Sequence, residues 1–310
     1  MAEPTLYDKV VNEIIRPPKL AYSEWDLPGD ELFQNAATVR TDFKVTNRDG
    51  IQLSCSVFHQ DGKLIEPRDF VVYCHTREGN RLQGLFLRHH FLPWANVVVF
   101  DFSGCGNSKA DYVTLGITES NDIVVVMKHI WGNWKPKNVV LWGRSMGAVA
   151  AIQFALRPAN QAYICCLVLD SPFINLNKLA EDIVKSRNYV PSFLIRCGIC
   201  CVRQDLKKKT GADIGGIENL EAVKQIDVPT VYVSGKSDQV VLQKRVKALY
   251  AAHKCREKAF IGIDTDHASE RSFPDMAKAT DFVRKRLGEA LAVKRPGLEF
   301  STVTFGEQNK

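Results

Sequence analysis

A series of short, almost continuous apolar runs constrains the fold of this chain more than any other feature. The runs are rich in valine and isoleucine and lie at 70–75, 96–101, 138–143, 166–170, 230–235 and 258–263. Continuous rather than alternating apolar residues are typical of strands buried on both faces, as in a parallel sheet covered by helices. Helical patterns lie between or after the runs, at 82–90, 119–131, 146–156, 243–252 and 274–287. The sequence therefore predicts an α/β domain with a mostly parallel central sheet flanked by helices.

The segments outside these runs suggest how the chain is divided. Residues 7–15 have one apolar helical face, and 43–58 alternate around the turn at 47–50 as a β-hairpin does. The long interval between Asp170 and Thr230 has helical patterns and no matching strand. We expect four parts: an N-terminal helix and extended segment at 1–41, an α/β domain at 42–290, a helical cap inserted within it at about 174–226, and a C-terminal tail at 291–310.

The stretch Gly-Arg-Ser-Met-Gly follows one apolar run and precedes a helical pattern. This strand–turn–helix context is that of a nucleophile elbow, in which a sharp turn exposes the serine hydroxyl. Gly143 and Gly147 are expected where a Cβ would clash with the crowded flanks of the turn. We therefore predict that Ser145 is a nucleophile. The backbone N–H of the next residue, Met146, is then a candidate oxyanion donor.

A serine nucleophile needs a base, which in turn needs an acid to orient it. On a scaffold with this elbow the acid and then the histidine follow the serine along the chain. His267 lies just past the last apolar run, whereas the pattern around His253 predicts a surface helix, so His267 is the preferred base. Asp238, in the loop after 230–235, is the preferred acid, and Asp170 at the end of an earlier run is the alternative.

Several motifs occur in the order and spacing of a known family. They are CHTREGNR, DFSGCGNS, GRSMGA, LDSPF, SGKSDQVV and DHAS. Over roughly residues 42–290 the chain resembles the α/β hydrolases, in particular the serine-aminopeptidase-like and prolyl-oligopeptidase-like group. That group includes protein depalmitoylases and relatives of monoacylglycerol lipase. The resemblance implies an α/β-hydrolase fold and a catalytic triad of Ser145, Asp238 and His267.

The same resemblance implies a second oxyanion donor, the backbone N–H of Arg77. The family usually has a glycine at the position of Thr76, and a threonine adopts positive φ only at a cost. The assignment of Arg77 therefore depends on the backbone conformation at Thr76. Asp266 likewise stands where a glycine commonly precedes the histidine, so its carboxylate either acts on His267 or faces solvent.

These features predict a serine hydrolase that cleaves an acyl ester or thioester through an acyl-enzyme on Ser145. No metal or organic cofactor is expected. One alternative is a peptidase of the same fold, an aminopeptidase or oligopeptidase, which has to anchor a peptide terminus. The cap has no clear acidic pair that would hold an α-amino group, and Glu181 and Asp182 are the only candidates. A second alternative is a non-catalytic binding protein that keeps the fold.

Charge and cysteine content indicate the cellular setting. The net charge of +6 is mild, and there is no basic stripe with interleaved aromatic residues, so we expect no nucleic-acid partner. Charged residues stand where a signal peptide would need an apolar core, and nine scattered cysteines are typical of reduced thiols. We therefore expect a cytoplasmic protein.

The apolar segment 189–202 within the expected cap contains Cys197, Cys200 and Cys201. A single Cys-x-x-Cys pair is a weak metal or redox signal, so apolar packing is the preferred interpretation. Because basic residues flank the segment, peripheral membrane contact through the cap or reversible palmitoylation is the alternative.

Overall fold

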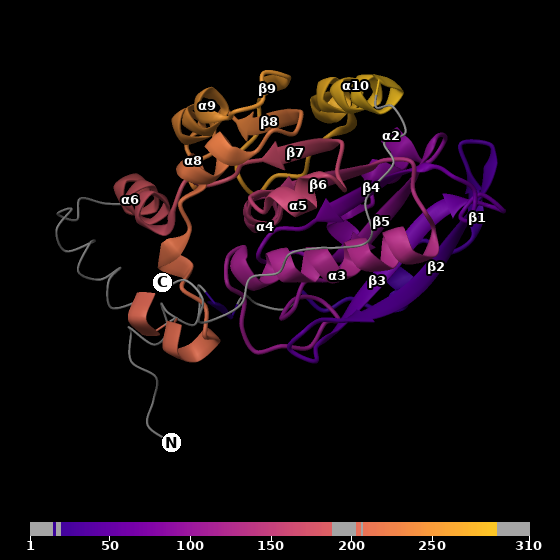
Figure 1. The fold of residues 1–310 in the computed structure, drawn as a ribbon, viewed down its shortest axis with the longest axis horizontal. Helices are drawn as coiled ribbons and strands as arrows, with labels where there is room; N and C mark the ends of the chain where they lie inside the picture. Colours follow the sequence, from indigo (N-terminus) through magenta and orange to yellow (C-terminus); the bar gives the residue numbers. More distant parts are fainter. Residues whose placement is uncertain (1–14, 17–19, 188–202, 206, 290–310) are drawn as a thin grey trace.

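The computed structural model describes residues 15–16, 20–187, 203–205 and 207–289, and its centre is a nine-stranded sheet (Figure 1). The strands are β1 (Glu31–Phe33), β2 (Ala36–Thr46), β3 (Gln52–Gln60), β4 (Asp69–Cys74), β5 (Ala95–Phe100), β6 (Val139–Arg144), β7 (Cys166–Asp170), β8 (Thr230–Gly235) and β9 (Lys258–Ile263). Their order across the sheet is β1-β2-β3-β5-β4-β6-β7-β8-β9. Strands β1, β2, β3 and β5 pair antiparallel in succession, and all pairs from β5 to β9 are parallel. The predicted fold class is confirmed, and each predicted apolar run is a strand within one residue of its expected bounds.

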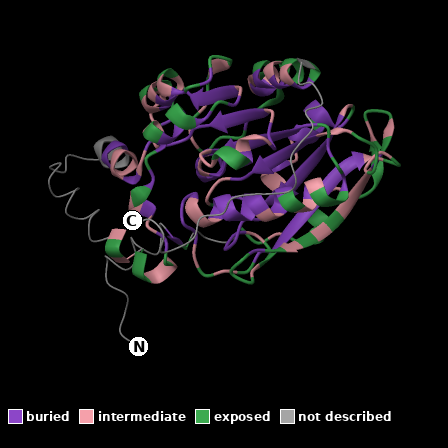
Figure 2. Ribbon diagram, in the orientation of Figure 1, coloured by how far each residue is buried: buried purple, intermediate pink, exposed green. Residues whose placement is uncertain are grey.

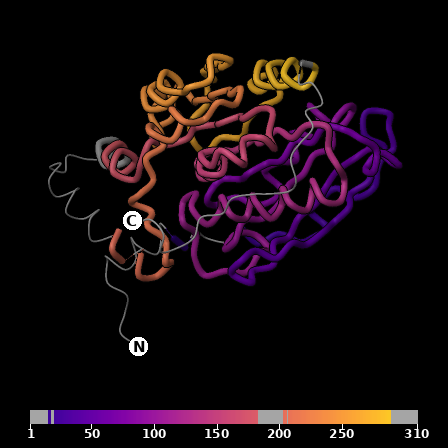
Figure 3. Tube along the Cα trace, viewed as in Figure 1, coloured from indigo at the N-terminus to yellow at the C-terminus, as the bar shows by residue number. Residues whose placement is uncertain are grey.

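Helices cover both faces of this sheet. They are α2 (Leu87–Phe91), α3 (Ile117–Asn133), α4 (Met146–Ala155), α5 (Pro158–Gln161), α6 (Leu176–Arg187), α8 (Asn219–Ala222), α9 (Gln243–Ala252) and α10 (Phe273–Glu289). Single 3-10 turns lie at η1 (Glu24–Asp26), η2 (Arg81–Gly84), η3 (Ile214–Gly216) and η4 (Val223–Gln225). The sheet is traversed from β1 at its antiparallel end to β9 at the other, as the colours from indigo to orange show (Figure 3).

The strand side chains divide between two apolar cores, one on each face of the sheet. In β4, Phe70 and Val72 contribute to the core under α3, α4 and α9, while Val71 and Tyr73 contribute to the core under α2 and α10. Strands β5, β6 and β7 are buried throughout, whereas β1 and β2 are mostly half-buried or exposed (Figure 2). This double burial is the physical reason that the central strands have continuous apolar sequences.

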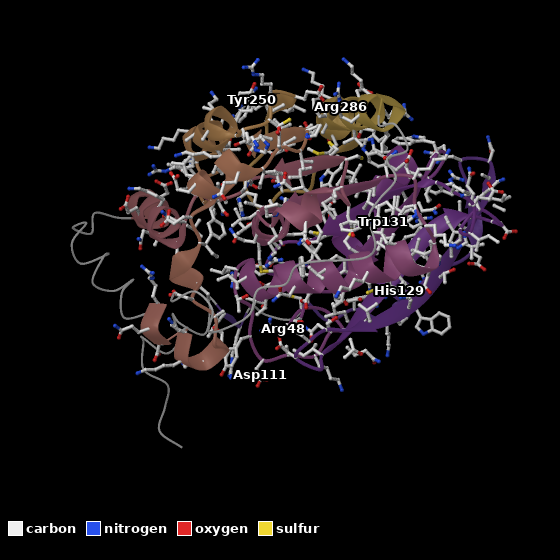
Figure 4. The ribbon with its side chains drawn as sticks, in the orientation of Figure 1. Arg48, Asp111, His129, Trp131, Tyr250 and Arg286 are labelled. Carbon is white, nitrogen blue, oxygen red and sulfur yellow. The ribbon has the colours of Figure 1, made fainter. Side chains whose placement is uncertain are left out.

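The antiparallel end of the sheet is covered in part by α3. The ring of His129, labelled in Figure 4, lies on α3. It stacks on Phe43 of β2, with centroids 4.4 Å apart and planes at 11°. β2 begins at Ala36, so the sheet extends into the segment expected to precede the α/β domain. Most of the predicted N-terminal helix at 7–15 lies outside the described residues.

The predicted helix at 82–90 was wrong as one continuous element. The chain forms the 3-10 turn η2 and then, after a short break, the α-helix α2. Gly84 accounts for the break in part, because glycine disfavours helix and lets the backbone approach the sheet. A Cβ at Gly84 would lie 2.6 Å from a methyl group of Val99 and 2.8 Å from the ring of Tyr73.

Within the described residues, the interval between β7 and β8 contains helix α6 and the short helical turns η3, α8 and η4. The segment 188–202, with Cys197, Cys200 and Cys201, lies outside the described residues, as does the tail at 291–310. In the part of the chain that is described, no helix is both long enough and apolar enough to cross a membrane.

Candidate active site

Ser145 lies between the end of β6 and the start of α4, in a strained backbone conformation with φ 52° and ψ −115°. A non-glycine residue with positive φ costs free energy and persists only where the surroundings impose it. The backbone N–H of Ser145 donates to the carbonyl of Asp170 at the end of β7 over 2.8 Å, which ties the turn to the sheet. The hydroxyl thus stands at the carboxyl edge of parallel strands, where α/β folds bind their ligands.

The two glycines of the motif are required by close packing. A Cβ at Gly147 would lie 2.0 Å from the carbonyl oxygen of Cys74, and one at Gly143 would lie 2.4 Å from the carbonyl oxygen of Gly147. Neither glycine has positive φ. Their role is therefore to let β4, β6 and α4 approach one another, as the sequence predicted for the flanks of the turn.

The structure brings Ser145, His267 and Asp238 together. The Oγ of Ser145 lies 3.1 Å from Nε2 of His267, and Nδ1 of His267 lies 2.8 Å from Oδ2 of Asp238. With Asp238 ionised, Nδ1 carries the hydrogen and donates to the carboxylate, which leaves Nε2 as the acceptor for the serine hydroxyl. The side chain of Asp238 is fully buried, while 19% of the His267 side chain is exposed.

The surroundings of Asp238 hold it as a carboxylate. Burial by itself raises its pKa, but hydrogen bonding and charge interaction with His267, together with two backbone donors, bring the pKa below its ordinary value. The donors are the N–H groups of Val240 and Val241, at 2.9 and 2.7 Å from Oδ1. One oxygen is thus held by the backbone and the other faces the imidazole.

The alternative acid, Asp170, is occupied by a different partner. Arg271 donates from Nε and Nη2 to its two carboxylate oxygens over 2.8 and 3.0 Å. This bidentate pair is buried. Both carboxylate oxygens of Asp170 therefore accept from Arg271.

The expectation for His253 was wrong. His253 directly follows α9 and is buried against β8, where its Nδ1 lies 2.9 Å from the hydroxyl of Tyr232. Burial lowers the pKa of His253 to about 4, so the ring is neutral at pH 7. The sequence predicted an exposed position because the last residue of an amphipathic helix cannot be assigned to a face from its spacing alone.

The loop after β4 holds the peptide between Thr76 and Arg77 in a defined orientation. The carbonyl of Thr76 accepts from Nδ1 of His75 over 2.6 Å and from the N–H of Gly79 over 3.0 Å. The N–H of Phe102 donates to Nε2 of His75, so Nδ1 is the protonated nitrogen of this buried ring. Since a peptide N–H points opposite to its carbonyl, these bonds fix the direction of the Arg77 N–H.

Thr76 is accommodated without backbone strain. It is not among the described residues with positive φ, and its N–H and hydroxyl both donate to Oε1 of Gln83 at 3.1 and 3.2 Å. A threonine in place of the family's glycine is therefore compatible with this loop. The second predicted donor, the N–H of Met146, belongs to the first turn of α4, where amides have no partner within the helix.

Asp266 stabilises its own loop. Its Oδ1 accepts from the N–H groups of Ala268 and Ser269 at 2.9 and 2.7 Å, and its side chain is exposed. The hydrogen bond from Ser269 is the main reason that the pKa of Asp266 lies below its ordinary value.

Two arginines beside the predicted triad were not identified from the sequence. Arg144 directly precedes Ser145, and Arg271 follows His267 by a few residues; both are buried and both bind carbonyl groups of the His267 loop. The sequence did contain a signal for Arg144, because an arginine at the end of a buried apolar strand needs a hydrogen-bond or charge partner. The carbonyl of His267 lies 123 positions from Arg144, and the carboxylate of Asp170 lies 101 positions from Arg271.

The described residues contain no group of three or more histidine, cysteine, aspartate or glutamate side chains placed to hold a metal ion.

Part of the chain matches a known protein family. Residues 67–198 match the family model described as serine aminopeptidase, S33. The chain has the α/β-hydrolase fold, and its residues 67–198, less than half of the chain, are similar to the serine aminopeptidase S33 family. The matched region covers β4, the predicted nucleophile turn and α6, but ends before the predicted acid and base.

The curated relatives of this chain are distant in sequence. It is 23% identical over 262 residues to the uncharacterized protein YfhR of Salmonella typhimurium, covering 81% of this chain and 82% of that protein. It is 24% identical over 167 residues to the uncharacterized protein R595 of Acanthamoeba polyphaga mimivirus, covering 43% of this chain and 57% of the viral protein.

Solved structures agree on the fold. The esterase Pf2001 of Pyrococcus furiosus superimposes with a TM-score of 0.64 at 23% identity, over 87% of this chain and 98% of that one. An esterase of Thermogutta terrifontis superimposes with a TM-score of 0.53 at 17% identity, over 80% and 98% of the two chains. At these identities the likeness establishes the fold alone.

Proposed function

We propose that this protein is a serine hydrolase that cleaves acyl esters or thioesters. The observation that carries the proposal is the connected set of hydrogen bonds from Ser145 through His267 to Asp238, with distances of 3.1 and 2.8 Å. A hydroxyl, a base and a buried carboxylate in this arrangement have the geometry of nucleophilic acyl transfer.

In the proposed mechanism Oγ of Ser145 attacks the acyl carbonyl carbon while Nε2 of His267 takes the hydroxyl proton. The imidazolium is stabilised by Asp238 and then gives the proton to the departing oxygen or sulfur, leaving an acyl-enzyme. A water molecule next attacks the acyl carbon and gives a proton to His267. The carboxylic acid leaves as Oγ takes that proton back.

The N–H groups of Met146 and Arg77 would hold the oxyanion in both steps. The fixed direction of the Thr76–Arg77 peptide supports this role, since a preorganised donor needs no rearrangement as charge develops.

An ester or thioester is favoured over a peptide with a free amino terminus. Asp182 makes a bidentate pair with Arg245 at 2.8 and 2.9 Å, and Glu181 pairs with Lys178 at 2.9 Å. The acidic pair that could anchor an α-amino group therefore already has cationic partners. The structural neighbours named as esterases support the same choice.

A fluorophosphonate probe tests the proposal, because it phosphonylates an activated serine whatever the natural substrate. The wild-type protein should be labelled, and Ser145→Ala and His267→Ala should lose labelling while remaining folded by circular dichroism. A panel of acyl esters, acyl thioesters and aminoacyl amides then separates the esterase from the peptidase. A folded wild-type protein that does not react would support the non-catalytic alternative instead.

A further inference from the structure

A buried cluster of charges links the predicted nucleophile to the loop that bears the predicted base. Asp170 lies between Arg144 and Arg271, and these three residues are 1%, 7% and 6% exposed. Arg271 makes the bidentate pair with the carboxylate, at 2.8 and 3.0 Å. Arg144 approaches the same carboxylate with its Nε at 3.6 Å, which is beyond hydrogen-bond distance.

The guanidinium of Arg144 is directed at the His267 loop rather than at the carboxylate. Its Nη2 donates to the carbonyl of His267 and to the carbonyl of Ser269, both over 2.7 Å. The Nε that faces Asp170 has no hydrogen-bond partner. The hydrogen bonds of this side chain are therefore made to the backbone of the loop that bears the imidazole, and none is made to the carboxylate.

Arg271 holds the same loop from a second position. Its Nη1 donates to the carbonyls of Asp266 and Ser269 at 2.9 and 3.2 Å and to the hydroxyl of Thr265 at 2.9 Å. Two guanidinium groups face one carboxylate, and the carbonyl dipoles of the loop offset the surplus positive charge. Apart from His267, the residues of this loop between Asp266 and Glu270 are exposed, and the two guanidinium groups bind its backbone from the protein interior.

We propose that Arg144 is a positioning residue that sets the distance between the nucleophile and the base. The proposal rests on the proposed function. Arg144 precedes Ser145 in the chain, and its guanidinium donates a hydrogen bond to the carbonyl of His267. A single residue therefore links the backbone of the nucleophile to the backbone of the base. Arg271 binds the loop from the other side, and the carboxylate of Asp170 lies within ion-pair distance of Arg144.

The test compares the concentration dependence of fluorophosphonate labelling in the wild-type protein and in Arg144→Ala. A misplaced base slows proton transfer but leaves binding of the probe intact. We expect the limiting labelling rate to fall about 100-fold, while the probe concentration at half-maximal rate is unchanged. Methylguanidinium, at concentrations below those that denature the protein, should fill the space and restore part of the limiting rate.

Arg88→Ala is the matched control. Arg88 is also a buried arginine, 5% exposed. It pairs with Glu31 of β1, the edge strand farthest from β9. Its loss should lower the unfolding temperature and leave the labelling rate of the folded protein unchanged. Restoration by methylguanidinium should be specific to Arg144→Ala.

Arg144→Lys covers the case in which Arg144→Ala does not fold. Lysine keeps a positive charge near Asp170 but lacks the guanidinium fork, so the limiting rate should still fall while the unfolding temperature stays near that of the wild type. Wild-type limiting rates in folded Arg144→Ala or Arg144→Lys would overturn the positioning role. Absence of labelling in the wild type itself would instead refute the proposed function.

Discussion

At the scale of single residues, two aspartates at strand ends are assigned to different roles by their neighbours. Asp170 is the last residue of β7 and is held by the guanidinium of Arg271, while Asp238 follows β8 and is held by backbone amides and the imidazole of His267. Only the second arrangement leaves a carboxylate oxygen available to orient the base.

Asp238→Asn tests this distinction. The backbone amides at Val240 and Val241 would retain the amide oxygen, so the amide nitrogen would face Nδ1 of His267. The ring would then be protonated on Nε2 and could not accept the proton of Ser145. We expect the limiting rate of fluorophosphonate labelling to fall by roughly 10³- to 10⁴-fold.

Asp264→Asn is the companion variant, because Asp264 is an exposed residue of the same region that pairs with Lys236. It should label at the wild-type rate. Equal rates for Asp238→Asn and the wild type would remove Asp238 from the triad.

At the scale of elements, β4, β6 and α4 meet at the predicted elbow with no space for side chains. The carbonyls of Cys74 and His75 at the end of β4 lie where a Cβ on Gly147 would stand, at 2.0 and 2.6 Å. The obstructing atoms are backbone, so a larger residue could be accommodated only if a strand or the helix moved.

Gly147→Ala should therefore destabilise the protein by at least about 1–3 kcal/mol, measured as the free energy of unfolding in urea. Gly29→Ala should change that free energy by less than about 0.5 kcal/mol, because nothing lies within 4 Å of a Cβ at Gly29 and its φ is not positive. A Gly147→Ala protein as stable as the wild type would show that these elements separate easily.

At the scale of the whole molecule, two buried histidines join elements on the two faces of the sheet. His90 of α2 bonds Thr280 of α10, while His253 lies between α9 and β8. Burial lowers the pKa of each ring to about 4, from an ordinary value of 6.5. Both rings are therefore neutral in the folded protein at pH 7.

These histidines predict how stability depends on pH. Between pH 6.5 and 4 the unfolded chain binds protons that the folded protein excludes, so their stabilising contribution is full above pH 6.5 and is lost as the pH falls. We expect each ring to lower the free energy of unfolding by about 1–2 kcal/mol between pH 7 and pH 5. Urea unfolding at the two pH values should show a smaller drop for His253→Gln than for the wild type; an equal drop would contradict the assignment.

Much of the fold and of the candidate site could be predicted because the signals are local. A strand buried on both faces needs a continuous apolar run, and the strained turn at Ser145 needs small flanking residues. Both requirements can be recognised within a few residues of sequence. The predicted triad residues then follow from the order of loops after successive strands, and their roles stay predictions until the variants are measured.

Tertiary structure decided the features that depend on residues far apart in the chain. Sequence spacing could not show that His253 is buried, that the helix at 82–90 is divided, or that Asp170 belongs to Arg271, 101 positions away. The same holds for Arg144 and the carbonyl of His267, which are separated by 123 positions. By itself the sequence determined the order of strands, turns and helices, because backbone preference and burial pattern act over short distances. The partner of each buried charge was decided only when the parallel strands brought their carboxyl ends to one edge of the sheet.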